Sequence, residues 1–398
     1  MKYSYDRAPI RKIPLSGFLS MVSVRNKRIA AAPDSPPVSE YNANRLAKSL
    51  HPEAQYAKIA RVDEHRDAKS FTLVPDEARG TKSLAFFRAS QYVSVGLNIG
   101  GAVLSKPYTI RSGPGSALGE DGTSYVLTIK RTEPGYASKW ILENWKEGDA
   151  VELSGPLGDF YYDRIRDAKT VVALAGGSGI TPFFSMAEAI ADGIEDFELT
   201  ILYGSRTAEG ILLREELDAV AARSGGRVKV VHVLSDEERE GYEHGFLTAE
   251  LVRKYAPEGD YSVFMCGPQA MYDYEERELQ KLSLPRRRIR RELSGDCIMS
   301  EPAKVKYKLT LDIHGYRRTI DCLANESLEW AIERAGIKAP THCRSGECGW
   351  CHSRLVSGEV YVPAEVDGRR VADKKFGWIH PCVSYPLSDI TLEVFPTA

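Results

Sequence analysis

The chain has 398 residues, more than one hydrophobic core usually organises, so its length favours two or three domains. With 27% charged residues and a formal net charge of −2, it has no global field that would attract nucleic acid or an anionic membrane. It contains no apolar run of about 18 residues and begins without the apolar region of a signal peptide. We therefore expect no nucleic-acid partner, no membrane insertion and a cytoplasmic location.

Residues 1–53 mix basic residues with Ser, Pro and Asn, and we leave this N-terminal extension unassigned. Residues 54–165 hold short β-rich runs separated by Gly, Pro and Asp clusters, which predict an antiparallel β-barrel. The runs cover residues 70–74, 91–99 and 124–131.

Residues 166–295 alternate apolar strands with helical segments, which predicts an α/β domain with a parallel sheet. Its strands are expected over 170–175, 199–205, 229–235 and 262–267, and its first helix over 183–194. A short polar linker, 296–304, then leads to a small α+β unit at 305–398. In that unit we expect strands at 306–313 and 316–322 and a helix at 327–336.

Four cysteines in the last unit have a characteristic spacing. Cys343 is followed by Cys348 and Cys351, and Cys382 stands alone 31 residues further on. This spacing matches the plant-type [2Fe–2S] arrangement, in which two thiolates hold each iron. Gly346 and Gly349 allow the loop the positive φ angles that close wrapping requires.

A structural zinc site is the alternative for these cysteines. Zinc usually takes two short Cys-x2–4-Cys pairs, whereas here the fourth ligand is isolated, so the pattern favours the iron–sulfur cluster. Cys297 and Cys322 lie outside the spacing, and we expect both to be structural.

The run ALAGGSGITPFF joins an apolar strand to a helix through Gly176, Gly177 and Gly179. We expect Thr181 to cap that helix and Pro182 to be its first residue. Glycines let the backbone approach phosphates, and a helix N-terminus offers free N–H donors, so this turn suits a pyrophosphate. Glycine turns of this kind also serve packing alone.

Two later strand ends support a nucleotide site. One ends at Ser205 and Arg206, and the other at Cys266, Gly267 and Pro268. Ligands of open parallel sheets bind at the carboxyl ends of the strands. We therefore expect a dinucleotide there, with Ser205 and Arg206 near the adenosine ribose.

This order of parts, a barrel followed by GGSGITP, YGSR, CGP and a cysteine loop, resembles the ferredoxin–NADP⁺ reductase superfamily with a fused C-terminal ferredoxin. The resemblance covers about residues 55–398 and is greatest to the electron-transfer components of ring-hydroxylating oxygenase systems. It implies a flavin in the barrel, NADH or NADPH in the α/β domain, and a β-grasp ferredoxin domain.

The resemblance also implies the flavin residues. The family motif Arg-x-Tyr-Ser/Thr falls on Lys106 to Thr109, where Tyr108 would pack on the isoalloxazine and Lys106 would face the phosphate. Lysine replaces the family's arginine and loses its bidentate fork. The other residues implied are Pro107, Thr128, Ile129, Lys130, Gly135, Ala137 and Ser138. FAD is favoured, and FMN remains the alternative.

The resemblance implies that the chain takes a hydride from NAD(P)H and passes single electrons through the cluster to a separate acceptor protein. In the most similar families that acceptor is an oxygenase. A flavin/iron–sulfur relay subunit of a larger complex is the alternative. Cys266 would position the nicotinamide, or only pack. The evidence for NADH and for NADPH is nearly balanced. Arg206 suits the 2′-phosphate of NADPH, and no acidic residue directly follows it to repel that phosphate. Similarly fused reductases more often resemble NADH users, so we expect NADH.

Overall fold

The computed structural model describes residues 15–31, 42–119, 122–132, 135–292 and 305–394. The chain divides into two compact units, residues 1–47 and 48–398. Two helices that the sequence analysis did not anticipate occur near the N-terminus, α1 (Leu15–Ala30) and α2 (Asn42–Leu50). The expected linker 296–304 and Cys297 lie outside the described residues.

None of the helices within these ranges has the length and apolar character that crossing a membrane requires. Among the described residues, the strands of the second unit form two six-stranded sheets, one five-stranded sheet and one two-stranded ribbon.

The first sheet is an antiparallel half-barrel with the strand order β4-β3-β6-β1-β2-β5. Its strands are β1 (Gln55–Glu64), β2 (Ala68–Pro75), β3 (Tyr92–Ile99), β4 (Ala102–Thr109), β5 (Tyr125–Lys130) and β6 (Ala150–Leu153), with α3 (Tyr136–Asn144) after β5. The outer strands meet beyond Thr109, where Arg111 N donates to Val126 O at 2.8 Å. This closure confirms the expected barrel architecture and brings β4 next to β5.

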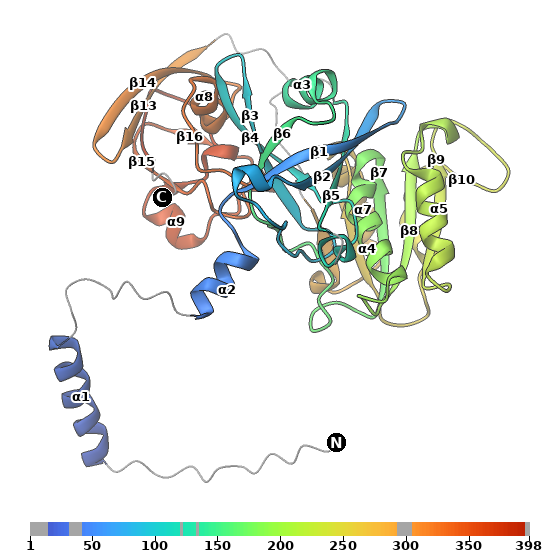
Figure 1. The fold of residues 1–398 in the computed structure, drawn as a ribbon, viewed down its shortest axis with the longest axis horizontal. Helices are drawn as coiled ribbons and strands as arrows, with labels where there is room; N and C mark the ends of the chain where they lie inside the picture. Colours follow the sequence, from blue (N-terminus) through green and yellow to red (C-terminus); the bar gives the residue numbers. More distant parts are fainter. Residues whose placement is uncertain (1–14, 32–41, 120–121, 133–134, 293–304, 395–398) are drawn as a thin grey trace. The chain divides into compact units, whose positions relative to one another are not determined.

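The second sheet is wholly parallel, with the order β10-β9-β8-β7-β11-β12. Its strands are β7 (Thr170–Gly176), β8 (Glu198–Ser205), β9 (Val228–Leu234), β10 (Glu243–His244), β11 (Ser262–Cys266) and β12 (Ile289–Arg291). Its helices are α4 (Thr181–Ala191), α5 (Arg214–Arg223), α6 (Ala249–Tyr255) and α7 (Gln269–Gln280) (Figure 1). The predicted α/β domain is therefore present.

Both faces of this sheet are covered, because alternate residues of a strand point to opposite sides. Val171 and Ala173 of β7 belong to the core formed with α4 and α5, whereas Val172 and Leu174 belong to the core formed with α6 and α7. Burial on both faces explains why these strands are continuously apolar in the sequence.

The third sheet is mixed, with the order β14-β13-β19-β15-β17. Its elements are β13 (Lys306–Ile313), β14 (Tyr316–Leu323), α8 (Leu328–Arg334), β15 (Ser353–Ser357), α9 (Val371–Lys375), β17 (Trp378–Ile379) and β19 (Ile390–Glu393). The ribbon pairs β16 (Val360–Tyr361) with β18 (Tyr385–Pro386). Leu328, Ala331 and Ile332 of α8 pack into this sheet's core, as expected for an α+β unit.

Candidate functional site

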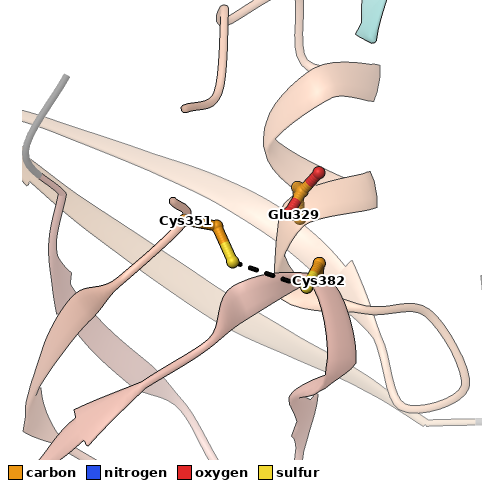
Figure 2. A group of neighbouring side chains, drawn as sticks. All are labelled: Glu329, Cys351 and Cys382. Atoms are coloured by element: carbon orange, nitrogen blue, oxygen red, sulfur yellow. Dashed lines mark hydrogen bonds between the residues drawn. The ribbon is translucent and has the colours of Figure 1, made fainter. Parts of the chain in front are cut away.

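The four cysteines of the predicted cluster site form two sulfur pairs. The Sγ atoms of Cys351 and Cys382 lie 3.4 Å apart (Figure 2). Cys343 Sγ accepts a hydrogen bond from the Cys348 N–H at 3.4 Å, and the two thiols also interact. Cys348 is exposed, while the other three are buried. Two pairs of thiolates are the ligand set that a two-iron cluster needs.

The loop backbone points N–H groups at these sulfurs, because Gly346 and Gly349 hold φ angles of 78° and 69°. Ser345 N donates to Cys343 Sγ and Trp350 N donates to Cys348 Sγ, each at 3.4 Å. The hydrogen bond shared by the two thiols lowers the pKa of Cys343 and raises that of Cys348. A deprotonated sulfur is the form that binds a metal. The site fits a [2Fe–2S] cluster.

Glu329 of α8 lies beside the second sulfur pair. One of its carboxylate oxygens and the Sγ atoms of Cys351 and Cys382 lie within 4.8 Å of one another, and Figure 2 shows the three side chains together. Glu329 also accepts a hydrogen bond from Arg344 Nη1 at 2.9 Å. Sequence reasoning missed this residue, because no ligand spacing connects it to the cysteines.

The strand ends expected to bind the nucleotide lie side by side. In the parallel sheet, Gly176 at the end of β7 pairs with Gly204 on β8, and Ala175 pairs with Cys266 on β11. Ser205 and Arg206 therefore lie on one side of the glycine turn, and Gly267 and Pro268 on the other. A Cβ on Gly179 would collide with the carbonyl oxygen of Cys266.

The helix start differs from the prediction. Gly177–Ile180 form a 3₁₀ turn, Ile180 is the N-cap of α4, and Thr181 is its first residue. Thr181 is therefore not the cap; its Oγ1 donates to Ser178 O at 3.1 Å, and Pro182 is the second helical residue. The prediction was wrong because Ile180 is itself already helical, with φ −70° and ψ −25°.

A cavity of about 1240 Å³ opens at these strand ends. Of the predicted site residues, it is lined by Gly176, Gly177, Ser205, Arg206, Pro268 and Lys130. Lys130 comes from the barrel, and its Nζ is 3.9 Å from the position of a Cβ on Gly177. The predicted site residues of the α/β domain that do not line the cavity are Gly179, Thr181, Pro182, Cys266 and Gly267. The Ser205 Oγ is buried at this cavity, next to the Tyr203 hydroxyl.

An acidic residue that the sequence analysis missed stands next to Arg206. Asp236 follows β9, and its Oδ2 accepts a hydrogen bond from Arg206 Nε at 2.8 Å. Hydrogen bonds from Ser235 and Arg206 lower the pKa of Asp236, so it stays ionised. Both side chains line the cavity. The sequence analysis considered only acidic residues adjacent to Arg206 in the chain. Asp236 follows the neighbouring parallel strand and reaches Arg206 in the folded protein.

The proposed flavin segments meet where the barrel closes. Lys106, Pro107, Tyr108 and Thr109 lie half-buried at the end of β4. On β5, Thr128 Oγ1 hydrogen-bonds Ser70 Oγ at 2.8 Å, and Lys130 pairs with Asp67 at 3.1 Å. Ile129 lies in the barrel core, so only its backbone can reach a ligand.

The third segment opens α3, with Gly135 as N-cap. No side chain caps that helix among the described residues, which leaves its first N–H groups available to a phosphate. Ser138 Oγ hydrogen-bonds Thr132 Oγ1 at 2.9 Å, and a Cβ on Gly135 would lie 2.5 Å from either atom. Ala137 is buried in the barrel core. These features fit a bound flavin nucleotide.

Cys266 is buried beside two residues that the sequence analysis did not identify. Its Sγ lies 3.8 Å from Glu292 Oε2, and Tyr272 OH donates to the backbone carbonyl of Glu292. Burial raises the pKa of Cys266 well above its usual range, which disfavours the thiolate that a nucleophile requires. Burial, followed by the charge of Glu347, raises the pKa of Glu292 to about 8. Glu292 can therefore hold a proton near neutral pH.

Three family models match the chain in order. They describe an oxidoreductase FAD-binding domain at residues 64–162, an oxidoreductase NAD-binding domain at 173–276 and a 2Fe-2S iron-sulfur cluster binding domain at 311–387. The order agrees with the three sheets and their sites.

The 3-ketosteroid-9-alpha-monooxygenase ferredoxin reductase component of Mycobacterium tuberculosis is 30% identical over 274 residues, which cover 66% of this chain and 74% of the relative. The chain belongs to the ferredoxin reductase family. This reductase is also 26% identical over 356 residues to the glycine betaine monooxygenase reductase subunit of Chromohalobacter salexigens, covering 83% and 93% of the two chains. The structure of phthalate dioxygenase reductase matches it with a TM-score of 0.63 and 27% identity, over 86% of this chain and 98% of that one.

This reductase is therefore an NAD(P)H-dependent oxidoreductase that uses FAD and a [2Fe–2S] cluster. The flavin is FAD, as the sequence analysis favoured.

Proposed function

We propose that this reductase supplies single electrons to a separate oxygenase component. The observation that carries the proposal is that the cysteine loop and the nucleotide cavity belong to the same compact unit. Cys348 of this loop is exposed, so an acceptor protein could approach the cluster there. Relatives named as reductase components of glycine betaine and 3-ketosteroid monooxygenases support an oxygenase as acceptor. A cytoplasmic location suits the free cysteines.

Each cofactor has its proposed residues. Cys343 and Cys348 would hold one iron, and Cys351 and Cys382 the other. Bound FAD supplies the conversion between a two-electron donor and a one-electron acceptor. Its proposed contacts are Lys106, Pro107, Tyr108, Thr109, Thr128, Ile129, Lys130, Gly135, Ala137 and Ser138.

The glycine turn and the strand ends would bind NADH. Gly176 and Gly177 would receive the pyrophosphate, and Cys266 would position the nicotinamide. NADH is favoured over NADPH because the carboxylate of Asp236 would repel a 2′-phosphate beside Arg206.

The cluster assignment is tested by Cys348→Ser. Removing one thiolate should abolish the electron paramagnetic resonance signal of the reduced cluster and the reduction of cytochrome c, a one-electron acceptor. Reduction of FAD by NADH, measured by stopped flow, should stay within about twofold, since it precedes the cluster in the electron path. Cys322→Ser, at a buried cysteine outside the loop, is the matched control and should change neither. Loss of FAD reduction together with the cluster would contradict this path.

The same purified protein distinguishes a complete reductase from the alternative, a relay subunit of a larger complex. An isolated chain that oxidises NADH with ferricyanide as acceptor is a complete reductase. A chain with all its cofactors that turns over only after a further subunit is added is a relay component of a larger complex.

A further inference from the structure

Arg344 lies in the cysteine loop, yet its side chain does not point to solvent. It is 1% exposed, and it is the largest of the fully buried side chains among the described residues. Its φ of 58° places a residue with a Cβ in the left-handed region, which costs energy for anything but glycine. The backbone next to Cys343 is thus held in an unfavourable conformation that directs a guanidinium inward.

The guanidinium joins the cysteine loop, α8 and the barrel. Arg344 Nη1 donates to Glu329 at 2.9 Å and to Glu333 at 2.8 Å. It also lies 3.3 Å from the backbone oxygen of Ser105 on β4. Glu333 Oε1 completes the junction by accepting the Ser105 N–H at 3.0 Å. Both backbone groups of Ser105 are therefore bound by the ferredoxin domain.

A second set of contacts lies beside this junction. Trp330, on the same helix as Glu333, has the Lys106 ammonium 5.5 Å from its ring centroid and the Tyr136 ring 5.6 Å away, edge to face. Lys106 belongs to the proposed flavin motif, and Tyr136 begins α3. The helix that carries Glu329 and Glu333 therefore rests on two of the proposed flavin segments.

Stability alone does not account for this junction. Arg344, Glu329 and Glu333 are each at most 1% exposed, and taking three charges out of water costs more than well-packed apolar side chains would. What a buried, directional ion-pair network provides instead is a single relative orientation of the parts that it joins.

We propose that Arg344 and Glu333 are positioning residues that hold the cluster loop on β4 and thereby set the rate of electron transfer from FAD to the cluster. The inference rests on the proposed function. One electron leaves reduced FAD, and the oxidised cluster gains it. Tunnelling rates fall steeply with distance, so a shift of the loop away from β4 slows this step without affecting hydride transfer from NADH.

The test uses Glu333→Ala and Glu333→Gln in the full chain with its cofactors, followed by stopped flow after mixing with NADH. E333A removes the acceptor of the Ser105 N–H and should slow cluster reduction about tenfold or more. E333Q keeps an acceptor oxygen but not the ion pair, so its rate should be intermediate. FAD reduction and the resonance spectrum of the reduced cluster should match the parent, while hydrogen exchange at residues 102–109 should become faster in E333A.

The matched control is Arg334→Ala on the same helix, whose ion pair with Glu326, 2.6 Å long, lies within the ferredoxin domain. It should leave the transfer rate unchanged. The positioning role is overturned if E333A transfers electrons as fast as the parent, if R334A slows transfer equally, or if E333A loses the cluster spectrum, which would indicate a purely structural role. A parent protein whose cluster is never reduced by NADH would instead contradict the proposed function.

Discussion

Glu275 of α7 buries a carboxyl group at the wall of the nucleotide cavity. Within the described chain, neither of its carboxylate oxygens has a hydrogen-bond partner. Burial raises its pKa to about 9. Between pH 4.5 and 9, the folded protein keeps a proton that the unfolded chain releases, so stability falls as pH rises through that window, by up to about 1.4 kcal/mol per pH unit.

Glu275→Gln should remove this cost. We expect the variant to unfold at nearly the parent's denaturant concentration at pH 5 and at a clearly higher one at pH 8, the difference growing between the two. Glu276→Gln, at the exposed neighbouring position, should show no such trend. A pH-independent difference between E275Q and the parent would mean that the carboxyl group titrates normally.

We expect Asp236 to limit which nucleotide Arg206 can bind. Its carboxylate occupies the guanidinium and adds a negative charge where a 2′-phosphate would lie. Asp236→Ser should therefore raise kcat/KM for NADPH by about tenfold or more and lower that for NADH only slightly. Steady-state kinetics with both nucleotides measures this, and Glu238→Gln on the same loop is the control for loss of charge. A parent that already prefers NADPH would refute the assignment.

At the scale of elements, the turn between β7 and α4 depends on close contact with β11. A Cβ on Gly179 would strike the carbonyl of Cys266 and lie 2.8 Å from Gly267 N. Gly179→Ala should push the turn off the strand end, destabilise the protein by about 1–3 kcal/mol and weaken NAD⁺ binding in calorimetric titration. In Gly204→Ala, where the nearest contacts are an ordinary 3.6 Å, stability should change little. Equal effects in both variants would contradict this explanation.

The sequence pattern predicted elements well where residues adjacent in the chain determine them. The glycine turn and the parallel strands could be predicted from short runs of sequence. That their ends lie side by side follows from the geometry of a parallel sheet. The cap at Thr181 was wrong because a 3₁₀ turn and a strand-to-helix loop share the same glycine signature. Helix α1 was missed because the surrounding prolines obscured its periodicity.

At the scale of the whole molecule, the N-terminal residues 1–47 form a unit separate from residues 48–398. All proposed cofactor residues lie in the second unit. Deleting residues 1–47 should therefore leave FAD content, the cluster spectrum and turnover with NADH and ferricyanide within about twofold of the full chain. Absorbance spectra and steady-state assays measure this. Loss of FAD or of the cluster on deletion would show that the extension stabilises the catalytic unit.

The order of domains could be derived from the sequence, but the contacts between them could not. Asp236 reaches Arg206 from another strand, and Arg344 reaches Ser105 across 239 positions of the chain. Neither pair has a sequence spacing that would reveal it. Such contacts arise only after strands are ordered and domains are packed. The spacing of the cysteines could therefore be used to predict cluster ligands, whereas Glu329, Glu333 and Asp236 were missed.

Strand β4 carries Ser105, which the ferredoxin domain binds, and Tyr108, three residues later, which is proposed to contact FAD. Because a strand rises about 3.3 Å per residue, these two points are about 10 Å apart along one rigid backbone. If β4 holds both the cluster loop and FAD as proposed, we expect electrons to pass between them without a large movement of the ferredoxin domain. The separate acceptor protein that we propose would then have to dock at the cluster for each electron that it takes.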